Sequence, residues 1–329
     1  MATNTKIADV IVPEVFQKYM LRETAEKSRV FNAGIMTSNP AIAGFLAGGG
    51  RTVNLPFWTD LYTGSTTDNI SGDDETVIAT TQKFTTQRDL AIRHSRNQSW
   101  SSSDLVAALA GDDPLKLIAQ RVGTYWANQF DKMTVSVLRG LVADNIAANS
   151  GDMVKDSTGS TITADLVIDA AATMGDADDR LACIIMHSKT YARLAKLNLI
   201  DFIPDSDGHV KFPTYLGFNV IRDDDCYQNG TITHTYLVAR DAFAWGEGTP
   251  KYPVETRREP LQANGGGVEI IVTRKEFVLH PYGYQWAIAT PGAGMVGQSP
   301  TDAEMLAATA WTRIAPRKNV GLAALITNL

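Results

Sequence analysis

The sequence has few of the residues on which small-molecule chemistry depends. Among 329 residues, five are histidine and only two, Cys183 and Cys226, are cysteine. Two isolated thiols provide neither a disulfide framework nor a zinc site, so we expect them to be buried or half-buried free thiols of a protein from a reducing compartment. Each histidine stands without a second ligand one helical turn or one strand pair away, so we interpret all five as structural or surface residues.

Several sequence patterns that are typical of enzymes are also missing. The chain has no Gly-x-x-x-x-Gly-Lys-Ser/Thr phosphate loop, no Gly-x-Gly-x-x-Gly after a strand and no Gly-x-Ser-x-Gly nucleophile turn. The Asp-Ser-Asp-Gly sequence at 205–208 resembles the start of a calcium loop but lacks its closing glutamate. The acidic groups at 176–179 and 223–225 are most simply charged turns, although a divalent cation where copies meet is an alternative. The sequence therefore predicts no catalytic, cofactor-binding or metal-binding residue.

Excess positive charge is absent as well. The formal net charge is -6 and the isoelectric point is about 5.4, which argues against a protein that binds nucleic acid by neutralising its phosphates. The first residues lack the basic and apolar parts of a signal peptide, and no apolar run approaches the length of a membrane span. We therefore expect synthesis in the cytosol and no association with a membrane.

What the sequence does contain is one long amphipathic pattern. Apolar residues recur every three or four positions from Leu115 to Leu141, which predicts a helix from Pro114 to about Ala148. Asp112 or Asp113 can cap its first amides. Such a helix is roughly 50 Å long, about three times the usual length. It is expected to act as a spine whose apolar stripe faces a sheet.

Glycines mark the places where this architecture is expected to bend. Gly123 and Gly140 weaken the long helix without ending it and are predicted sites of flexure. The stretch from Gly34 to Gly50 is rich in glycine and alanine and predicts a hinge. Before that hinge, residues 1–12 form an arm and 13–32 a helix whose charged side is either solvated or an inter-subunit contact.

Residues 51–99 predict a projecting ribbon. Two strand-like stretches, from Thr52 to Trp58 and from Gln82 to Ile92, flank a polar tip at 64–75. A two-stranded ribbon is marginally stable in water unless another surface covers it. Such a ribbon suits an assembly in which it overlaps a neighbouring chain.

The remaining sequence predicts a compact α/β unit followed by longer strands. We expect a polar loop at 149–161, a helix at 164–174 capped by Thr163, a buried strand at Leu181–Met186, a helix from a cap at Ser188 to about 199, and a surface loop at 203–213. Further strands are predicted at 218–222, 235–239, 252–258 and 268–279, the last one spanning the edge of a sheet. A Thr301–Glu304 capping box predicts a helix to about 312, and 320–327 predicts a final strand.

Taken in order, these parts resemble a tailed-phage major capsid protein with the Hong Kong 97-type fold. The His-Pro-Tyr-Gly sequence at 280–283, the stretch at 298–306 and the Lys-Asn-Val at 318–320 are similar to the ends of one group of phage coat proteins. The resemblance implies an α+β fold whose parts follow the chain in this order: N-terminal arm and helix, 1–50; extended β-hairpin loop, 51–99; peripheral domain with the spine helix, 100–162; apical α/β domain, 163–248; peripheral β-sheet strands, 249–290; return to the apical domain, 291–329.

The resemblance also implies a function. Such proteins self-assemble into the hexamers and pentamers of an icosahedral head that encloses double-stranded DNA, which they touch weakly and non-specifically. The implied partners are further copies of the chain, a portal and a decoration protein, and the implied location is the virion. A separate scaffolding protein is also expected; the alternative is a scaffolding segment removed before this numbering begins. Some members cross-link a loop lysine to an asparagine of a neighbour; Lys83 is the lysine of this loop, but no acceptor matches by motif. No cofactor and no enzymatic activity are expected.

Two other classes remain as alternatives. A tail-tube or decoration protein is also a virion component, although tube proteins lack so long a single helix and decoration proteins are usually small. An unrecognised α/β enzyme is the other alternative, and it leaves the projecting ribbon unexplained.

Overall fold

A computed structural model of the chain shows its architecture. It describes residues 34–38, 50–58, 68–74, 76–83, 86–110, 114–204, 210–287 and 299–329, and single positions at 42, 44, 46, 48 and 297. The predicted helix at 13–32, the caps Asp112 and Asp113 and the acidic loop at 205–208 lie outside the described residues. No helix of the described part is long and apolar enough to cross a membrane.

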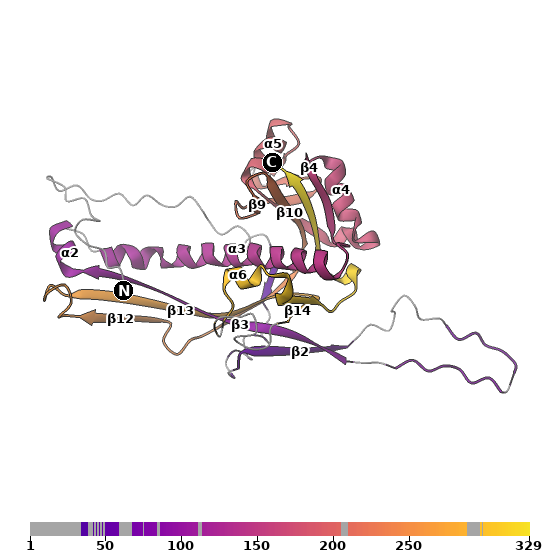
Figure 1. The fold of residues 1–329 in the computed structure, drawn as a ribbon, viewed down its shortest axis with the longest axis horizontal. Helices are drawn as coiled ribbons and strands as arrows, with labels where there is room; N and C mark the ends of the chain where they lie inside the picture. The colour runs from indigo at the N-terminus through magenta and orange to yellow at the C-terminus, as the bar shows by residue number, and fades with distance from the viewer. Residues whose placement is uncertain are drawn as a thin grey trace.

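The predicted spine is confirmed as α3 (Pro114–Ala148), a helix of 35 residues. Figure 1 shows it along the molecule, above a long sheet and beneath a smaller α/β unit. Its apolar residues are buried from Trp126 to Leu141, and the Trp126 indole donates to Thr273 Oγ1 in that sheet at 3.2 Å. Nearer its start, Ile118 and Val122 are only half-buried. The apolar stripe therefore contacts the sheet mainly through its second half.

The long sheet has six strands that come from distant parts of the chain. Its order is β1 (Met36–Ser38), β11 (Phe243–Gly248), β13 (Val268–Pro281), β3 (Thr86–Ser103) and β2 (Thr52–Trp58), with β12 (Val254–Glu259) also paired to β13. β13, predicted as an edge-spanning strand, is interior, because β3, β11 and β12 all pair with it. β11 lies in this sheet, although the boundary expected at 248 groups it with the apical unit.

The smaller unit contains an eight-stranded sheet. Its order is β4 (Val154–Thr161), β16 (Leu322–Asn328), β10 (Ile232–Ala239), β5 (Leu181–Met186), β8 (Phe218–Arg222), β7 (Val210–Tyr215) and β6 (Asp201–Pro204), with β9 (Tyr227–Asn229) paired to β10. Helices α4 (Ala164–Ala172) and α5 (Ser188–Lys196) contribute to a core on one face of this sheet, with Ile184 and Leu237. Ile185 and Val238 point the other way, into the core that includes α3.

Two predicted loops contain strands. Residues 149–161 include β4, which pairs in parallel with β16, and 203–213 overlap β6 and β7, which pair with each other. β4 and β6 lie at the two ends of the sheet order. β4 is polar, as edge strands with one side open to solvent often are, and this obscures its strand pattern. β6 has only four residues, and each of β6 and β7 contains a proline, which is typical of a loop in the sequence.

Two helix ends also differ from expectation. The cap of α5 is His187 rather than Ser188, because its Nδ1 accepts a hydrogen bond from the Lys189 amide at 3.1 Å. The Thr301–Glu304 capping box is confirmed, but the helix that it opens, α6 (Asp302–Met305), is one turn long rather than reaching 312. The chain then passes through the 3-10 turn η4 (Ala308–Ala310) into β15 (Trp311–Arg313), which pairs with β14 (Tyr284–Trp286).

Gly140 allows this segment to pack very closely on α3. A Cβ atom at Gly140 would lie 2.0 Å from the Met305 carbonyl oxygen and 2.7 Å from the Trp311 Nε1. That indole nitrogen donates to the same carbonyl oxygen at 2.9 Å. α3 is one helix through this position. In the described subunit, Gly140 is therefore a point of close packing; the flexure predicted there and at Gly123 stays a prediction.

Candidate assembly surfaces and the junction between the two sheets

The extended loop is the most exposed part of the described chain. β2 and β3 pair from Thr52 with Ile92 to Trp58 with Thr86. Farther out, Asn69 Nδ2 donates to the Thr80 carbonyl at 2.9 Å and Asn69 Oδ1 accepts from the Thr80 amide at 3.1 Å. This reciprocal pair joins the two sides of the loop where no strand pairing is present in the described residues. The hairpin predicted at 51–99 is confirmed at its base.

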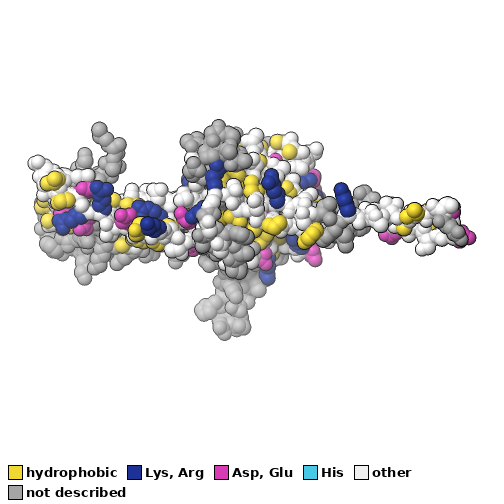
Figure 2. Space-filling view, turned by 90° about the horizontal axis from the view of Figure 1, so that it is seen from below, with side chains coloured by type: hydrophobic (Ala, Val, Ile, Leu, Met, Phe, Trp, Pro, Cys, Tyr) yellow, Lys and Arg dark blue, Asp and Glu magenta, His cyan; other side chains and the backbone are white. Residues whose placement is uncertain are grey.

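The far end of this loop combines apolar and acidic side chains. Ile70, Val77 and Ile78 are 96%, 72% and 88% exposed. The Asp74 carboxylate closes a turn by accepting from the Thr76 hydroxyl at 2.6 Å and the Thr76 amide at 2.9 Å, and these bonds lower the pKa of Asp74. Figures 1 and 2 show the loop projecting far from the rest of the molecule, and Figure 2 shows hydrophobic and acidic side chains along it. Exposed apolar groups in this position make the loop end a candidate contact surface.

The long sheet carries many charges, and several of them form ion pairs. Arg274 Nη2 lies 2.9 Å from Glu255 Oε2, and Lys275 is paired with Glu247. Arg93 is paired with Glu276 across β3 and β13, Arg257 with Glu259 within β12, and Arg258 with Asp104, the residue after β3. Figure 2 shows positive and negative side chains interspersed along this part of the molecule. Each exposed pair is worth little in stability, but together they leave the surface balanced in charge.

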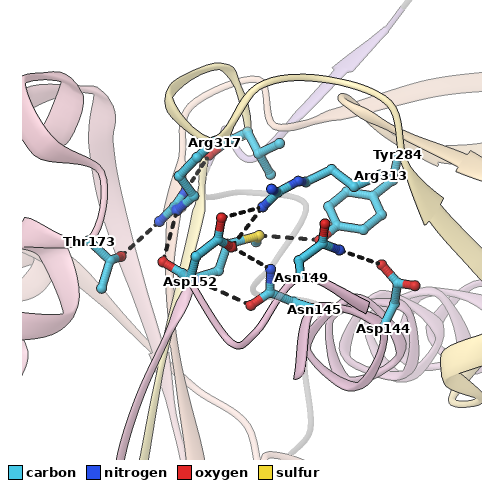
Figure 3. Close-up of polar contacts among 10 residues, drawn as sticks. Asp144, Asn145, Asn149, Asp152, Thr173, Tyr284, Arg313 and Arg317 are labelled. Carbon is cyan, nitrogen blue, oxygen red and sulfur yellow. Dashed lines mark hydrogen bonds and ion pairs between the residues drawn. The ribbon is translucent and has the colours of Figure 1, made fainter. Parts of the chain in front are cut away.

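A polar network connects the end of the spine helix to the C-terminal segment (Figure 3). Asp152 accepts from Arg313 Nη1 at 2.7 and 2.9 Å and from Asn145 Nδ2 at 2.7 Å. Asn145 Oδ1 accepts from the Met153 amide at 3.0 Å. Partial burial acts to raise the pKa of Asp152, but the hydrogen bonds from Arg313 and Asn145 and the neighbouring charges of Arg313 and Arg317 outweigh it and hold that pKa below its usual value.

Arg317 extends this network to the apical unit. Its Nη2 donates to Thr173 Oγ1 at 2.8 Å, its Nη1 to the Val320 carbonyl at 3.1 Å and its Nε to the Asp152 carbonyl at 3.3 Å. Thr173 ends α4, so one guanidinium joins the outer helix of the apical unit to the loop that follows the spine. We call the set Asn145, Asp152, Thr173, Arg313 and Arg317 the junction network. It joins the end of the spine helix, the C-terminal segment and α4 of the apical unit.

The buried histidines have structural surroundings, as predicted for them. His94 stacks on Phe277 with ring centroids 5.1 Å apart, and burial lowers the pKa of His94 to about 3. His280 Nε2 lies 2.8 Å from Asp89 Oδ2 between β13 and β3. Burial also lowers the pKa of His234 to about 4. His187 caps α5, and His209 lies outside the described residues.

The cysteines and the acidic turns provide no metal site in the part of the chain that the structure describes. Cys183 and Cys226 are buried free thiols, as predicted, and burial raises the pKa of both. Asp176 pairs with Lys318 at 2.5 Å, and burial raises the pKa of Asp223 to about 6. No group of three or more His, Cys, Asp or Glu side chains in the described residues is placed to hold a metal ion.

Comparison with known proteins decides the family. The chain is 36% identical over 324 residues to the protein named "Major capsid protein" of Bacillus phage SPP1, covering 96% of each chain. This chain belongs to the family of phage major capsid proteins. A comparison with models of protein families finds no match. Relatives in this family have a structural rather than an enzymatic role, and the capsid protein takes its place in the shell of a phage virion by associating with copies of itself.

Solved structures agree on the fold. The capsid protein superposes on a chain of the cyanophage Pam1 capsid with a TM-score of 0.58, at 9% identity and with 96% of each chain covered. For a chain of Mycobacterium phage Bobi the TM-score is 0.56, at 12% identity and 98% coverage of both. At such low identity these matches show the fold alone. The α+β Hong Kong 97-type fold predicted from the sequence is confirmed.

Sequence reasoning did not find the junction network of this capsid protein. Asp152 and Arg313 are 161 residues apart, so no short motif contains both. The local signals were an asparagine near the end of the long helix and a pair of arginines in the C-terminal segment. Neither signal shows which residue the asparagine or the arginines contact; that requires the folded structure.

Proposed function

We propose that this capsid protein builds the hexamers and pentamers of an icosahedral head that encloses double-stranded DNA. The observation that supports this most is the extended loop, whose end exposes three large apolar side chains, Ile70, Val77 and Ile78. In the described part of the chain no other element covers them. In the proposed head this loop lies over a neighbouring subunit.

The energies favour assembly by many weak contacts. Full burial of one such side chain is worth about 1.5–3 kcal/mol, so three of them offset only part of the entropy lost when two subunits associate. Each subunit of a closed shell makes this contact and others at the same time, and multivalency then stabilises the whole. A loop of this kind therefore suits reversible assembly that becomes stable on closure.

The charges support weak contact with the packaged DNA. The net charge is -6, and the arginines and lysines of the long sheet named above are paired with carboxylates. Paired cations release few counterions from DNA, so they contribute little to its binding. We assign the six-stranded sheet with α3 to the peripheral domain and the eight-stranded unit to the apical domain. We include in the proposal synthesis in the host cytoplasm and, as partners, a separate scaffolding protein, a portal and a decoration protein.

Negative-stain microscopy and sedimentation of the purified capsid protein test the assembly proposal. Wild type, with its scaffolding partner where required, should form closed shells. Ile78→Asp should leave dispersed subunits or capsomers, because it places a charge in the contact, whereas the matched control Ile78→Leu should assemble normally. Tubes would indicate a tail protein, and wild-type protein that remains monomeric under all assembly conditions would contradict the proposal.

A further inference from the structure

The strand β12 gives the long sheet an open edge. β12 pairs with β13 on one side, and no strand in the described part of the chain pairs with its other side. Residues 254–258 of this strand are all exposed, including Val254, which is 64% exposed. Figure 1 shows β12 at the margin of the molecule, beside β13. An open edge presents unpaired amides and carbonyls with which another chain can pair.

Alternate residues of β12 direct their backbone groups toward this edge. The Arg274 amide of β13 donates to the Pro253 carbonyl at 2.8 Å, so the bonds to β13 come from the odd-numbered positions. In an antiparallel ladder, bonded positions alternate with positions whose amides and carbonyls point to the other side. Val254, Thr256 and Arg258 therefore direct these groups outward. They offer a second strand a row of donors and acceptors.

The sequence of β12, Val-Glu-Thr-Arg-Arg-Glu, is complementary to itself in one antiparallel register. When a two-fold axis relates two such strands, one residue lies opposite its own copy. If that residue is Thr256, then Glu255 lies opposite Arg257 of the second copy, and Val254 lies opposite the aliphatic stem of Arg258. The symmetry makes each of these pairs twice. Opposite charges and paired threonines that face each other across a ladder are favourable.

The neighbouring registers bring like charges together. An axis at Arg257 places that arginine opposite its own copy and Glu255 opposite Glu259. An axis at Glu255 places two glutamates opposite each other. Like charges directly across a ladder are destabilising. The charges of β12 therefore select the register centred on Thr256, and they select a second copy of this chain as the partner.

The ion pairs already present on β12 are compatible with this contact. Glu255 Oε2 lies 2.9 Å from Arg274 Nη2, and Arg257 is paired with Glu259. The side chains of Glu255 and Arg257 are nevertheless 51% and 71% exposed. A carboxylate has two acceptor oxygens and a guanidinium has several donors, so each can bind a second charged group. Pairing of two copies would extend these ion pairs into one network.

We propose that two copies of the capsid protein pair through β12 as antiparallel strands about a two-fold axis at Thr256, which joins their long sheets into one continuous sheet. This rests on the proposed function, in which copies of the chain form a closed shell. The contact is isologous, so it closes on two copies and cannot generate a ring, whereas the contacts within a hexamer or pentamer are heterologous. The β12 pair therefore links subunits of different capsomers.

Disulfide trapping in shells of the full chain tests the contact directly. Opposed residues that share hydrogen bonds have Cα atoms about 5.5 Å apart, which suits a disulfide, so oxidation should link Thr256→Cys into dimers. Val254→Cys is the matched control, because four residues of strand, about 13 Å, separate it from its own copy. Wild type, whose two native thiols are buried, should stay monomeric on denaturing gels.

The gels distinguish this contact from the proposed function. Shells of Thr256→Cys that remain monomeric after oxidation would overturn the β12 pairing and leave the proposed function intact. Equal linking of Thr256→Cys and Val254→Cys would overturn the register. Wild-type protein that forms no shells would count against the proposed function itself.

A proline at the same position tests the backbone pairing. Thr256→Pro removes an amide that points away from β13, a position where edge strands tolerate proline, so circular dichroism should show a folded subunit. Each contact then loses two hydrogen bonds, and the yield of closed shells should fall by about tenfold while capsomers accumulate. Thr256→Val keeps the amide and should assemble as wild type does. A wild-type yield of shells from folded Thr256→Pro would overturn the proposal.

Discussion

Two glycines of the same helix should respond in opposite directions to substitution by alanine. Gly123 is exposed, and a Cβ atom there would have no heavy atom within 4 Å. Alanine is preferred over glycine in a helix interior by about 1 kcal/mol, so Gly123→Ala should stabilise the capsid protein by about 0.5–1 kcal/mol. Helix propensity alone predicts the same gain for Gly140→Ala.

The surroundings of Gly140 reverse that sign. Its Cβ would lie 2.0 Å from the Met305 carbonyl oxygen, which is backbone and cannot turn aside as a side chain can. Moving that segment away costs about 1–3 kcal/mol as overpacking. The Trp311 indole, which is 2% exposed, also loses its hydrogen bond to that oxygen, at about 1–3 kcal/mol for a buried unpaired donor. After subtraction of about 1 kcal/mol for propensity, Gly140→Ala should destabilise by roughly 1–5 kcal/mol.

The assay is denaturant unfolding of unassembled protein, followed by tryptophan fluorescence and by circular dichroism. Trp311 is one of six tryptophans, so the emission of folded Gly140→Ala should differ from that of wild type, whereas the emission of Gly123→Ala should not. If Gly140→Ala is as stable as Gly123→Ala, the close packing on α3 described here is wrong. A gain in flexure with no loss of stability would instead favour Gly140 as a bend.

Three further predictions concern charged groups. Asp152→Ala removes three charge-assisted hydrogen bonds and leaves the mostly buried Arg313 unpaired, so it should destabilise the folded protein by about 2–4 kcal/mol. Because the pKa of Asp152 is lowered in the folded state, wild type should lose this stabilisation as pH falls below the pKa of an unfolded aspartate. An acid-unfolding midpoint that is the same in the variant and in wild type would contradict this. The pKa of Asp223 is raised to about 6, so its charged form destabilises the folded state above that pH, and this destabilisation disappears as pH falls toward 4. In urea titrations, Asp223→Asn should therefore be more stable than wild type at pH 7.5 and equal to it near pH 4. Lys83 is exposed with no matched acceptor in the sequence, so denaturing gels of mature particles should show monomers, and a ladder that Lys83→Ala abolishes would establish a cross-link.

Elements with a strong local signal were predictable from the sequence. The spine follows from a repeat of three and four residues and begins at Pro114, as predicted. The buried strand β5 was predicted with the bounds that the structure shows, because a short continuous apolar run between turn residues is typical of a strand buried on both faces. Thr163 and Thr301 both cap their helices. In each case the deciding residues lie within a few positions of one another.

What could not be predicted depends on contacts between distant segments. β4 is a polar edge strand and β6 is an edge strand of only four residues that ends in a proline, so only their pairing identifies them. Helix propensity alone predicts that Gly140 weakens the helix. The structure shows instead that the Met305 carbonyl lies so close to Gly140 that a larger residue would not fit. The junction network is of the same kind. Of the candidate contact surfaces, the sequence predicted the projecting ribbon. It did not predict which side chains of the ribbon are exposed, because that depends on the fold.

The order of strands in the long sheet has a consequence for synthesis on the ribosome. β3 ends at Ser103, and β13, which pairs with it from Arg93 to Ser103, begins only at Val268. At roughly 5–20 residues per second, the ribosome needs about 10–30 s to make the residues between them. During that time one edge of β3 has no partner in its own chain, and open edges pair readily with other chains. Nascent subunits therefore need protection by a chaperone, or a low local concentration, before a shell can begin to form.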